Sequence, residues 1–292
     1  MKGKKMNQEH SPTWGWTLYS DFFLGAIGGG LLIVGSLAML VRGHGYVNAA
    51  PFVTAVVAMG AGSSLLVIEL GNPLRAWRVF TNPRSYLMIG ASLMTISMGL
   101  SLLLASFYLP NLPWSHLKGI QNILALLAAL TGLGVALYPG LLLGEMVSRP
   151  FWRGPLLAPL FLLSGLSTGM ATFCLLGHIW PATEESVYRS LSNMNALFLI
   201  AQVVGWITYV FIKQGLASPR EVVAWEATFT GVRRVVFWGG FMGLGLVIPC
   251  AFYFFPDVNL ALVAHVLVLI GAFIIRGFVV TADQGVPLGF SM

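Results

Sequence analysis

Four side chains that can exchange protons or donate hydrogen bonds lie near the ends of long apolar segments. Trp16, Tyr19 and Asp21 lie at the start of the first such segment, and Tyr138 lies near the end of the fourth. A bound quinone needs an apolar slot for its ring, donors for its carbonyl oxygens and a nearby proton source. We therefore take these residues as candidate quinone-binding residues, with Asp21 and Tyr138 as the candidate catalytic pair.

An ordinary membrane interface explains the same residues equally well. Polytopic membrane proteins carry belts of Trp and Tyr at the headgroup level, and an aspartate at a helix end can simply reach water. Composition does not separate the two interpretations, so both stay open at this point.

Other ionisable side chains also fall at or near membrane depth, where burial is expensive and each such group is a functional candidate. Glu69 ends the second apolar segment, and Arg276 falls inside the last. Glu69 can equally pair with Arg75 or Arg78 at the interface, because such pairs are common at helix ends.

The elements that position these residues must be membrane helices. Of 292 residues, 57% are hydrophobic and 9% are charged, against about 25% charged in a soluble domain, and the mean hydropathy is +0.82. These values exclude a water-soluble globule. The pI is near 9.6, but the basic residues sit in short loops, so no nucleic-acid partner is expected and the surrounding partner is lipid.

Continuous apolar runs of about twenty residues predict helices rather than barrel strands, which would alternate over about ten residues. The fold class is therefore all-α: a polytopic membrane protein with eight transmembrane helices packed as helical bundles and both termini on one face. The predicted spans are 22–41, 49–70, 87–109, 119–143, 156–177, 194–212, 235–256 and 258–280.

Around these spans we expect three parts: a polar N-terminal segment 1–21, the eight-helix domain 22–280 and a C-terminal tail 281–292. The first span has no convincing cleavage site and is expected to be retained. Ser218-Pro219-Arg220-Glu221 reads as a capping box with proline at the first helical position, which predicts a short interfacial helix near 219–229.

Basic residues are divided unequally between the two faces. The face holding the N-terminus carries twelve of the sixteen lysines and arginines and the other face carries three, with Arg276 inside the last span. By the positive-inside rule, the N-terminal face is cytoplasmic. The same arginines can instead form a docking surface for an acidic subunit, and the rule is then uninformative for them.

Cysteine and glycine usage narrows the chemistry further. Only Cys174 and Cys250 are present, whereas an iron–sulfur cluster normally needs four thiolates, so any such cluster belongs to a partner. The two thiols are expected to be small buried side chains rather than a disulfide. Gly25 and Gly28-Gly29-Gly30 fall within the first span and predict close helix packing rather than a phosphate loop.

Several short motifs together resemble one family. They are Val135-Ala136-Leu137-Tyr138-Pro139-Gly140, Ser148-Arg149-Pro150-Phe151-Trp152, Glu69-Leu70-Gly71-Asn72-Pro73 and Asn82-Pro83-Arg84-Ser85. The set resembles the NrfD-type family of integral membrane subunits, which includes the polysulfide reductase membrane anchor. The likeness runs from the first span to the fifth and, more weakly, to Arg276-Gly277.

This resemblance implies the membrane anchor and quinone-reactive subunit of a respiratory oxidoreductase complex. Such a subunit binds menaquinone or ubiquinone and has no haem or cluster of its own. It docks a ferredoxin-like iron–sulfur subunit and, through it, a molybdopterin-type catalytic subunit. It lies in a bacterial or archaeal cytoplasmic membrane. In several members the face bearing the quinone site is periplasmic, which conflicts with the charge count above.

The resemblance also assigns roles to single residues, with one departure. Tyr138 matches the tyrosine implicated in quinone contact, whereas Asp21 stands where the polysulfide reductase has a quinone-contacting histidine and Leu18 where it has an asparagine. The expected mechanism is electron exchange with the docked cluster and proton exchange through Tyr138 or Asp21. Coupling to proton translocation stays open: Gln202, Ser164, Ser167 and Thr168 could hydrate a central path, or simply bond the backbone of their own or a neighbouring helix. The expected proton route uses Glu69, Arg75, His178 and Arg276, and the expected docking surface uses Arg78, Arg84, Arg149, Trp152 and Arg153.

Two other functions remain as alternatives. His178 and His265 lie near the less basic face and are geometrically conceivable axial ligands of a single b-type haem. Glycine- and proline-interrupted spans with intramembrane Asp21, Glu69 and Arg276 suggest a secondary transporter. A transporter is expected to place its polar groups at the midplane, whereas Asp21, Glu69 and Tyr138 lie near one face.

Overall fold

The computed structural model describes residues 15–69, 85–110, 112–145, 151–152, 154–180, 185–215 and 229–282. Within these residues, eight helices are long and apolar enough to cross a membrane. This confirms the predicted all-α class and the predicted spans. The first six are α1 (Trp16–Arg42), α2 (Ala50–Glu69), α3 (Tyr86–Ser106), α4 (Lys118–Gly144), α5 (Leu157–Ile179) and α6 (Glu185–Gly215).

The seventh span is continuous but not uniform. It consists of α8 (Gly231–Val235), a π-helical stretch η3 (Val236–Val247) and α9 (Ile248–Tyr253), and α10 (Val258–Thr281) is the eighth span. A short 3-10 turn, η1 (His44–Tyr46), joins α1 to α2. π-Helical segments are rare and usually last a single turn, so this stretch is an unusual feature of the helix.

Two boundaries differ from the prediction in an informative way. Helix α1 begins at Trp16, not at 22, and α6 begins at Glu185, not at 194. Both helices begin before their apolar run begins. Polar residues continue a helix when their side chains face the protein core or reach the membrane interface. The interfacial helix predicted near 219–229 lies outside the described residues, apart from Phe229.

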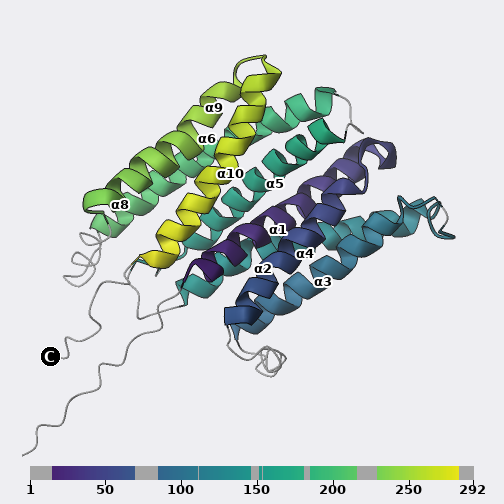
Figure 1. The fold of residues 1–292 in the computed structure, drawn as a ribbon, viewed down its shortest axis with the longest axis horizontal. Helices are drawn as coiled ribbons and strands as arrows, with labels where there is room; N and C mark the ends of the chain where they lie inside the picture. Colours follow the sequence, from purple (N-terminus) through teal and green to yellow (C-terminus); the bar gives the residue numbers. More distant parts are fainter. Residues whose placement is uncertain are drawn as a thin grey trace, which may run out of the picture.

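Helices α1 and α5 occupy the centre of the molecule (Figure 1). Helix α1 packs against α2, α4, α5 and α10, while α5 packs against α1, α4, α6 and α10. Figure 1 shows α2, α3 and α4 on one side of this central pair and α6, α8, α9 and α10 on the other. The start of α1 and the end of α10 lie at the same end of the bundle, as an even number of crossings requires.

Glycines on α1 allow three neighbouring helices to approach its backbone. A Cβ at Gly28 would lie 3.0 Å from the Ala55 carbonyl oxygen of α2, and one at Gly29 would lie 2.8 Å from the Gly132 oxygen of α4. At Gly30 it would collide with the Gly165 oxygen and the Gly169 backbone of α5. The predicted role of the glycine run in tight packing is confirmed, since small residues let membrane helices come together.

The two cysteines, Cys174 on α5 and Cys250 on α9, are free thiols. Cys174 is buried and Cys250 is half-buried. Their sulfurs lie 3.9 Å from the Tyr188 carbonyl oxygen and 3.8 Å from the Ala196 carbonyl oxygen, respectively.

The α1–α5 crossing predicts a large effect from one methyl group. Gly169→Ala places a Cβ against the backbone of Gly30, so the two helices must separate, at a cost of about 1–3 kcal/mol. We expect a lower midpoint of thermal unfolding for the detergent-purified protein. Gly99→Ala on α3 is the matched control, because its Cβ meets nothing within 4 Å. Equal midpoints for both variants would contradict the packing described here.

Candidate functional site

Asp21 and Tyr138 meet inside the bundle although 117 residues separate them. The Tyr138 hydroxyl donates to Asp21 Oδ2 at 3.1 Å. The Asp21 side chain is fully buried and Tyr138 is 4% exposed. The bond therefore links α1 to α4 out of contact with water, where a carboxyl and a phenol can pass a proton between them.

Two glycines make the space in which this pair lies. A Cβ at Gly62 of α2 would approach Asp21 Oδ1 to 2.8 Å, and one at Gly90 of α3 would approach the Tyr138 ring to 2.5 Å. Any larger residue at either position would displace the pair. The site is thus enclosed by α1, α2, α3 and α4, with backbone lying directly against the reactive groups.

One oxygen of the carboxyl group is left unused. Asp21 Oδ1 is buried and has no hydrogen-bond partner among the described residues. Leaving a buried polar atom unpaired costs about 1–3 kcal/mol, so such an atom in a native protein calls for an explanation, such as a catalytic role or a bound water or ion. A hydrogen-bonding group of a ligand placed beside Gly62 would satisfy this oxygen.

The Tyr138-Pro139-Gly140 sequence explains how α4 presents the phenol. Pro139 lies inside the helix, where it lacks an N–H and frees the Val135 carbonyl from its usual bond. A Cβ at Gly140 would meet the backbone of Ala158 at the start of α5. Gly140 thus allows α4 to lie directly on α5, while the preceding Tyr138 points to α1.

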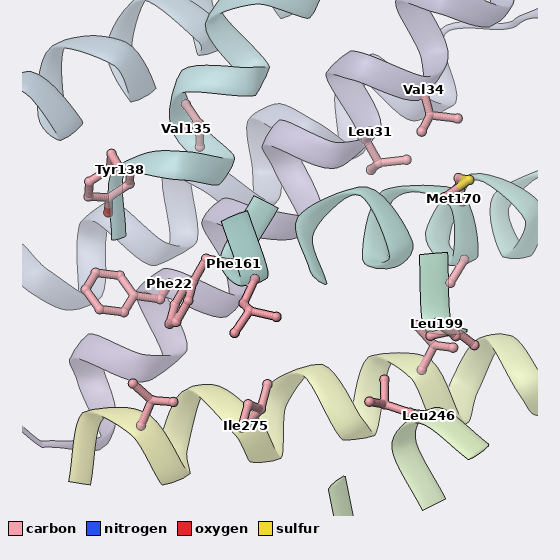
Figure 2. Packing of buried hydrophobic residues seen from close by; sticks show 14 of the residues in the cluster. Phe22, Leu31, Val34, Val135, Tyr138, Phe161, Met170, Leu199, Leu246 and Ile275 are labelled. Atoms are coloured by element: carbon pink, nitrogen blue, oxygen red, sulfur yellow. The ribbon is translucent and has the colours of Figure 1, made fainter. Parts of the chain in front are cut away.

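Aromatic rings and one arginine side chain surround Phe22, the residue that follows Asp21 on α1. The Phe22 ring makes edge contacts with Tyr138 and Phe161, with centroids 6.0 and 6.4 Å apart (Figure 2). Its carbonyl oxygen accepts from Arg276 Nε at 3.1 Å. The Arg276 Cζ atom lies 5.6 Å from the centre of the Phe161 ring. A buried cation is therefore fixed one residue from Asp21.

The structure separates the other two predicted quinone contacts from this pair. Trp16 is 61% exposed. Tyr19 packs edge-on against Phe273 of α10, with ring centroids 5.4 Å apart, and it faces Gly277. Residues 19 and 21 are about 200° apart around a helix, so they face different neighbours. Only Asp21 and Tyr138 of the four candidates are in mutual contact.

The predicted proton-route and docking residues differ in their burial, and several of them lie outside the described residues. His178 is exposed at the end of α5, and Arg276 is buried and bonded to Phe22 as described above. Trp152 is fully buried, and its indole donates to the Val279 carbonyl at 2.6 Å, so its side chain faces the protein core. The Glu69 side chain, together with Arg75, Arg78, Arg84, Arg149 and Arg153, lies outside the described residues.

A second polar cluster was not predicted as a unit. The Tyr253 hydroxyl lies 2.7 Å from His265 Nδ1, and Asn195 Nδ2 donates to the same hydroxyl at 3.2 Å. His265 is thus paired inside the core while His178 is exposed, and these different surroundings do not favour a shared haem. The intramembrane amide of Asn195 was the available sequence signal for this cluster.

Metal binding has no visible basis in the part of the chain that the structure describes. No group of three or more His, Cys, Asp or Glu side chains is suitably arranged there. The candidate site instead offers a phenol, apolar rings and a carboxyl group with one oxygen that no described residue bonds. These groups fit an organic ligand with polar ring substituents, such as a quinone or quinol.

Known proteins resemble the chain over most of its length. The family described as "Polysulphide reductase, NrfD" matches residues 4–287. A polysulfide reductase component of Wolinella succinogenes is 27% identical over 267 residues, covering 84% of this protein and 84% of that one. Protein NrfD of Escherichia coli is 26% identical over 313 residues, covering 94% of this protein and 96% of that one.

A further relative has a different named substrate. A selenate reductase component of Mesobacillus selenatarsenatis is 23% identical, and the match covers 85% of this protein and 68% of that one. The family match spans all eight membrane helices and the Asp21–Tyr138 site. The resemblance found in the sequence motifs is therefore confirmed: the chain is a multi-pass membrane protein that belongs to the NrfD family of polysulphide reductase subunits.

Proposed function

We propose that this chain is the quinone-reactive membrane subunit of a respiratory reductase complex. The observation that carries the proposal is the buried Asp21–Tyr138 pair, whose second carboxyl oxygen has no hydrogen-bond partner in the part of the chain that the structure describes. Two of the relatives are named as individual components of larger reductases, which supports a multisubunit complex. The partners proposed here are a ferredoxin-like iron–sulfur subunit and, beyond it, a molybdopterin-type catalytic subunit.

The position of the pair suits contact with both lipid and a docked partner. Asp21 is five residues into α1 and Tyr138 is six residues from the end of α4, which places them about 8–9 Å from one end of the bundle. A lipid-soluble quinone reaches this depth through the hydrocarbon phase. A cluster in a subunit docked on the same face would lie close enough to exchange electrons with it.

The two side chains have complementary tasks. The Tyr138 hydroxyl holds Asp21 Oδ2, which leaves Oδ1 as the atom that exchanges a proton with the ligand. Oxidation of a quinol releases two electrons, which would leave for the partner's iron–sulfur cluster, and two protons, which the Asp21 carboxylate would accept one after the other, passing the first on before it takes the second. Reduction of a quinone would reverse both transfers. The apolar rings of Phe22 and Phe161 exclude water and keep the exchange within the pair.

Side chains next to the Asp21–Tyr138 pair would determine how a quinone ring is accommodated. Met94 of α3 is buried against Gly25 of α1. A Cβ added at Gly25 would lie only 2.6 Å from Met94 Cε. The Ser63 hydroxyl lies 3.5 Å from the Met94 sulfur. Since methionine is unbranched and adaptable, Met94 is the side chain best suited to move when a quinone ring enters beside Gly62 and Gly90.

The loops at this end supply the proposed docking surface. Arg78, Arg84, Arg149 and Arg153 follow α2 and α4 in the sequence, and these two helices finish at the end of the bundle that holds Asp21 and Tyr138. An arginine-rich face suits an acidic partner and increases its rate of association. Glu69 and Arg75 are proposed to line a polar route by which protons pass between this face and the site, with Glu69 as the group that exchanges them.

Removal of the phenol oxygen is the first test. In the purified complex, Tyr138→Phe is expected to lower quinone-linked electron transfer by about tenfold or more, because proton transfer by a positioned group contributes at least that much. Turnover with a soluble quinol analogue and an artificial acceptor measures the effect. Tyr108→Phe is the control, since among the described residues the Tyr108 hydroxyl donates to the Met39 sulfur alone, at 3.6 Å. Full activity in Tyr138→Phe would overturn its proposed role.

The carboxyl group is tested without breaking the α1–α4 link. Asp21→Asn keeps an oxygen that accepts from Tyr138 but removes the proton acceptor, so turnover should fall as far as in Tyr138→Phe while the complex stays assembled. The double variant should lose no more than about twofold beyond either single variant, since residues that act as a unit are not additive. Additive losses would show that the two residues act separately.

Membrane orientation is tested with reporters. The excess of lysine and arginine on the N-terminal face predicts a cytoplasmic C-terminus. Alkaline phosphatase, which is active only outside the cytoplasm, should be inactive when fused to the C-terminus and active when inserted at Gly45, between α1 and α2. The opposite pattern would reverse the proposed orientation and leave the eight-helix fold unchanged.

A further inference from the structure

Two cations lie together on the membrane face that has few of them. The face opposite the Asp21–Tyr138 pair carries Arg42, Lys118 and Arg189 as its lysines and arginines, whereas the other face carries twelve. Arg42 is the last residue of α1 and Lys118 is the first residue of α4, and both are exposed. Two of the three basic residues of this face therefore lie at the ends of two neighbouring helices.

The packing of α1 on α4 brings these two ends to the same membrane depth. The helices are antiparallel, and a Cβ at Gly29 would lie 2.8 Å from the Gly132 carbonyl oxygen where they meet. Arg42 comes thirteen residues after Gly29, and Lys118 comes fourteen residues before Gly132. Each cation is thus about 20 Å from this contact along its own helix, so both belong to one corner of the bundle.

No carboxylate of the first four helices balances these charges. Residues 22–68 and 85–144 contain no aspartate or glutamate, and the two acidic residues of these helices, Asp21 and Glu69, lie at the other end of the bundle. The dipole of a helix favours a cation in its last turn, as in α1, but disfavours one in its first turn. Because α4 begins with Lys118 and has no acidic residue in its first turn, helix stability does not account for this lysine.

Arg189, the third cation of this face, has an acidic neighbour and provides a comparison. Glu185 lies four residues before it on α6, which is the spacing of a helical ion pair. The other acidic residues of this face are Glu184, which precedes α6, and Asp257, which caps α10 by accepting from the Asn259 N–H at 2.8 Å. The acidic residues of this face therefore belong to α6 and α10 and not to the corner of α1 and α4.

His44 adds a hydrogen-bonding group beside the two cations. It follows Arg42 by two residues in η1, and its Nδ1 is buried without a partner among the described residues. Nε2 is therefore the ring nitrogen that a ligand can reach. Burial and then the positive charge of Lys118 lower the pKa of His44, so the ring is neutral at pH 7 and can donate one hydrogen bond.

Apolar surface lies next to these polar groups. Within α1, which the structure describes throughout, no residue between Trp16 and Leu37 is exposed. Trp114, four residues before α4, is 39% exposed and marks the headgroup level of the membrane. The exposed apolar side chains at the corner are Leu37, Leu40 and Val41 of α1 and Leu117, Ile120 and Ile123 of α4. Acyl chains can therefore lie on both helices directly beside the cations.

We propose that the corner formed by Arg42, His44 and Lys118 binds the phosphate of an anionic phospholipid, whose acyl chains lie along the exposed ends of α1 and α4. The guanidinium and ammonium groups neutralise the phosphate through charge-assisted hydrogen bonds, and the His44 ring adds a neutral donor. The bound lipid joins the end of α1 to the start of α4. The inference does not depend on the proposed quinone function.

Binding is tested with the purified full chain in detergent by native mass spectrometry, which counts bound lipid molecules. Phosphatidylglycerol and phosphatidylcholine with identical acyl chains are titrated separately, and the wild-type chain should retain one phosphatidylglycerol more tightly. Arg42→Gln and Lys118→Gln should each weaken phosphatidylglycerol binding about fivefold and leave phosphatidylcholine binding unchanged. Arg42→Lys keeps the charge and should retain most of the affinity. Arg189→Gln is the matched control, because it removes an exposed cation from the same face.

The possible outcomes separate a lipid site from weaker explanations. Equal retention of the two lipids by the wild-type chain would overturn the inference, as would an equal loss in Arg189→Gln, since any cation of this face would then serve. Glycerol 3-phosphate carries the phosphate without acyl chains, and binding of this compound as tightly as phosphatidylglycerol would overturn the lipid assignment. No quinone or partner subunit is present in the experiment, so none of these results bears on the proposed quinone function.

Discussion

The hydrogen bond between Tyr138 and Asp21 is the interaction on which the site depends. In a hydrocarbon environment a buried carboxyl group has no water to turn to, so its neighbours must accommodate it. Here one oxygen is held by a phenol from a helix far away in the sequence. The other is pressed against Gly62 without a partner among the described residues. The helices packed around α1 bring these groups together. The oxygen without a described partner is the atom that remains available to bond a ligand.

The central position of α1 and α5 gives the molecule two connected halves. The α1–α4 half holds the Asp21–Tyr138 pair, and the α5–α10 half holds the buried amide, phenol and imidazole cluster. Glycine-to-backbone contact at Gly30 and Gly169 holds the two central helices together at van der Waals distance. Arg276 then bridges the halves by hydrogen bonds to Phe22 on one side and Ser164 on the other.

Much of this could be predicted from the sequence, because apolar length alone determines how a polypeptide spans lipid. The eight spans, the packing role of Gly28–Gly30 and the choice of Asp21 and Tyr138 as candidates all followed from residue type and position. The separation of Tyr19 from Asp21 depends on which neighbour each side of α1 faces, and a run of apolar residues does not encode this. The inward turn of Trp152 and the pairing of Tyr253 with His265 are likewise tertiary facts.

The Trp152 indole has a mechanical consequence. It binds the carbonyl of Val279 on α10, while Phe151 beside it packs edge-on against Phe278. Arg276 lies three residues before Val279, less than one turn away. Trp152 and Phe151 therefore tie the chain between α4 and α5 to α10, within one helical turn of the buried Arg276 guanidinium. A residue outside the membrane-spanning helices thus helps to fix where a buried positive charge lies.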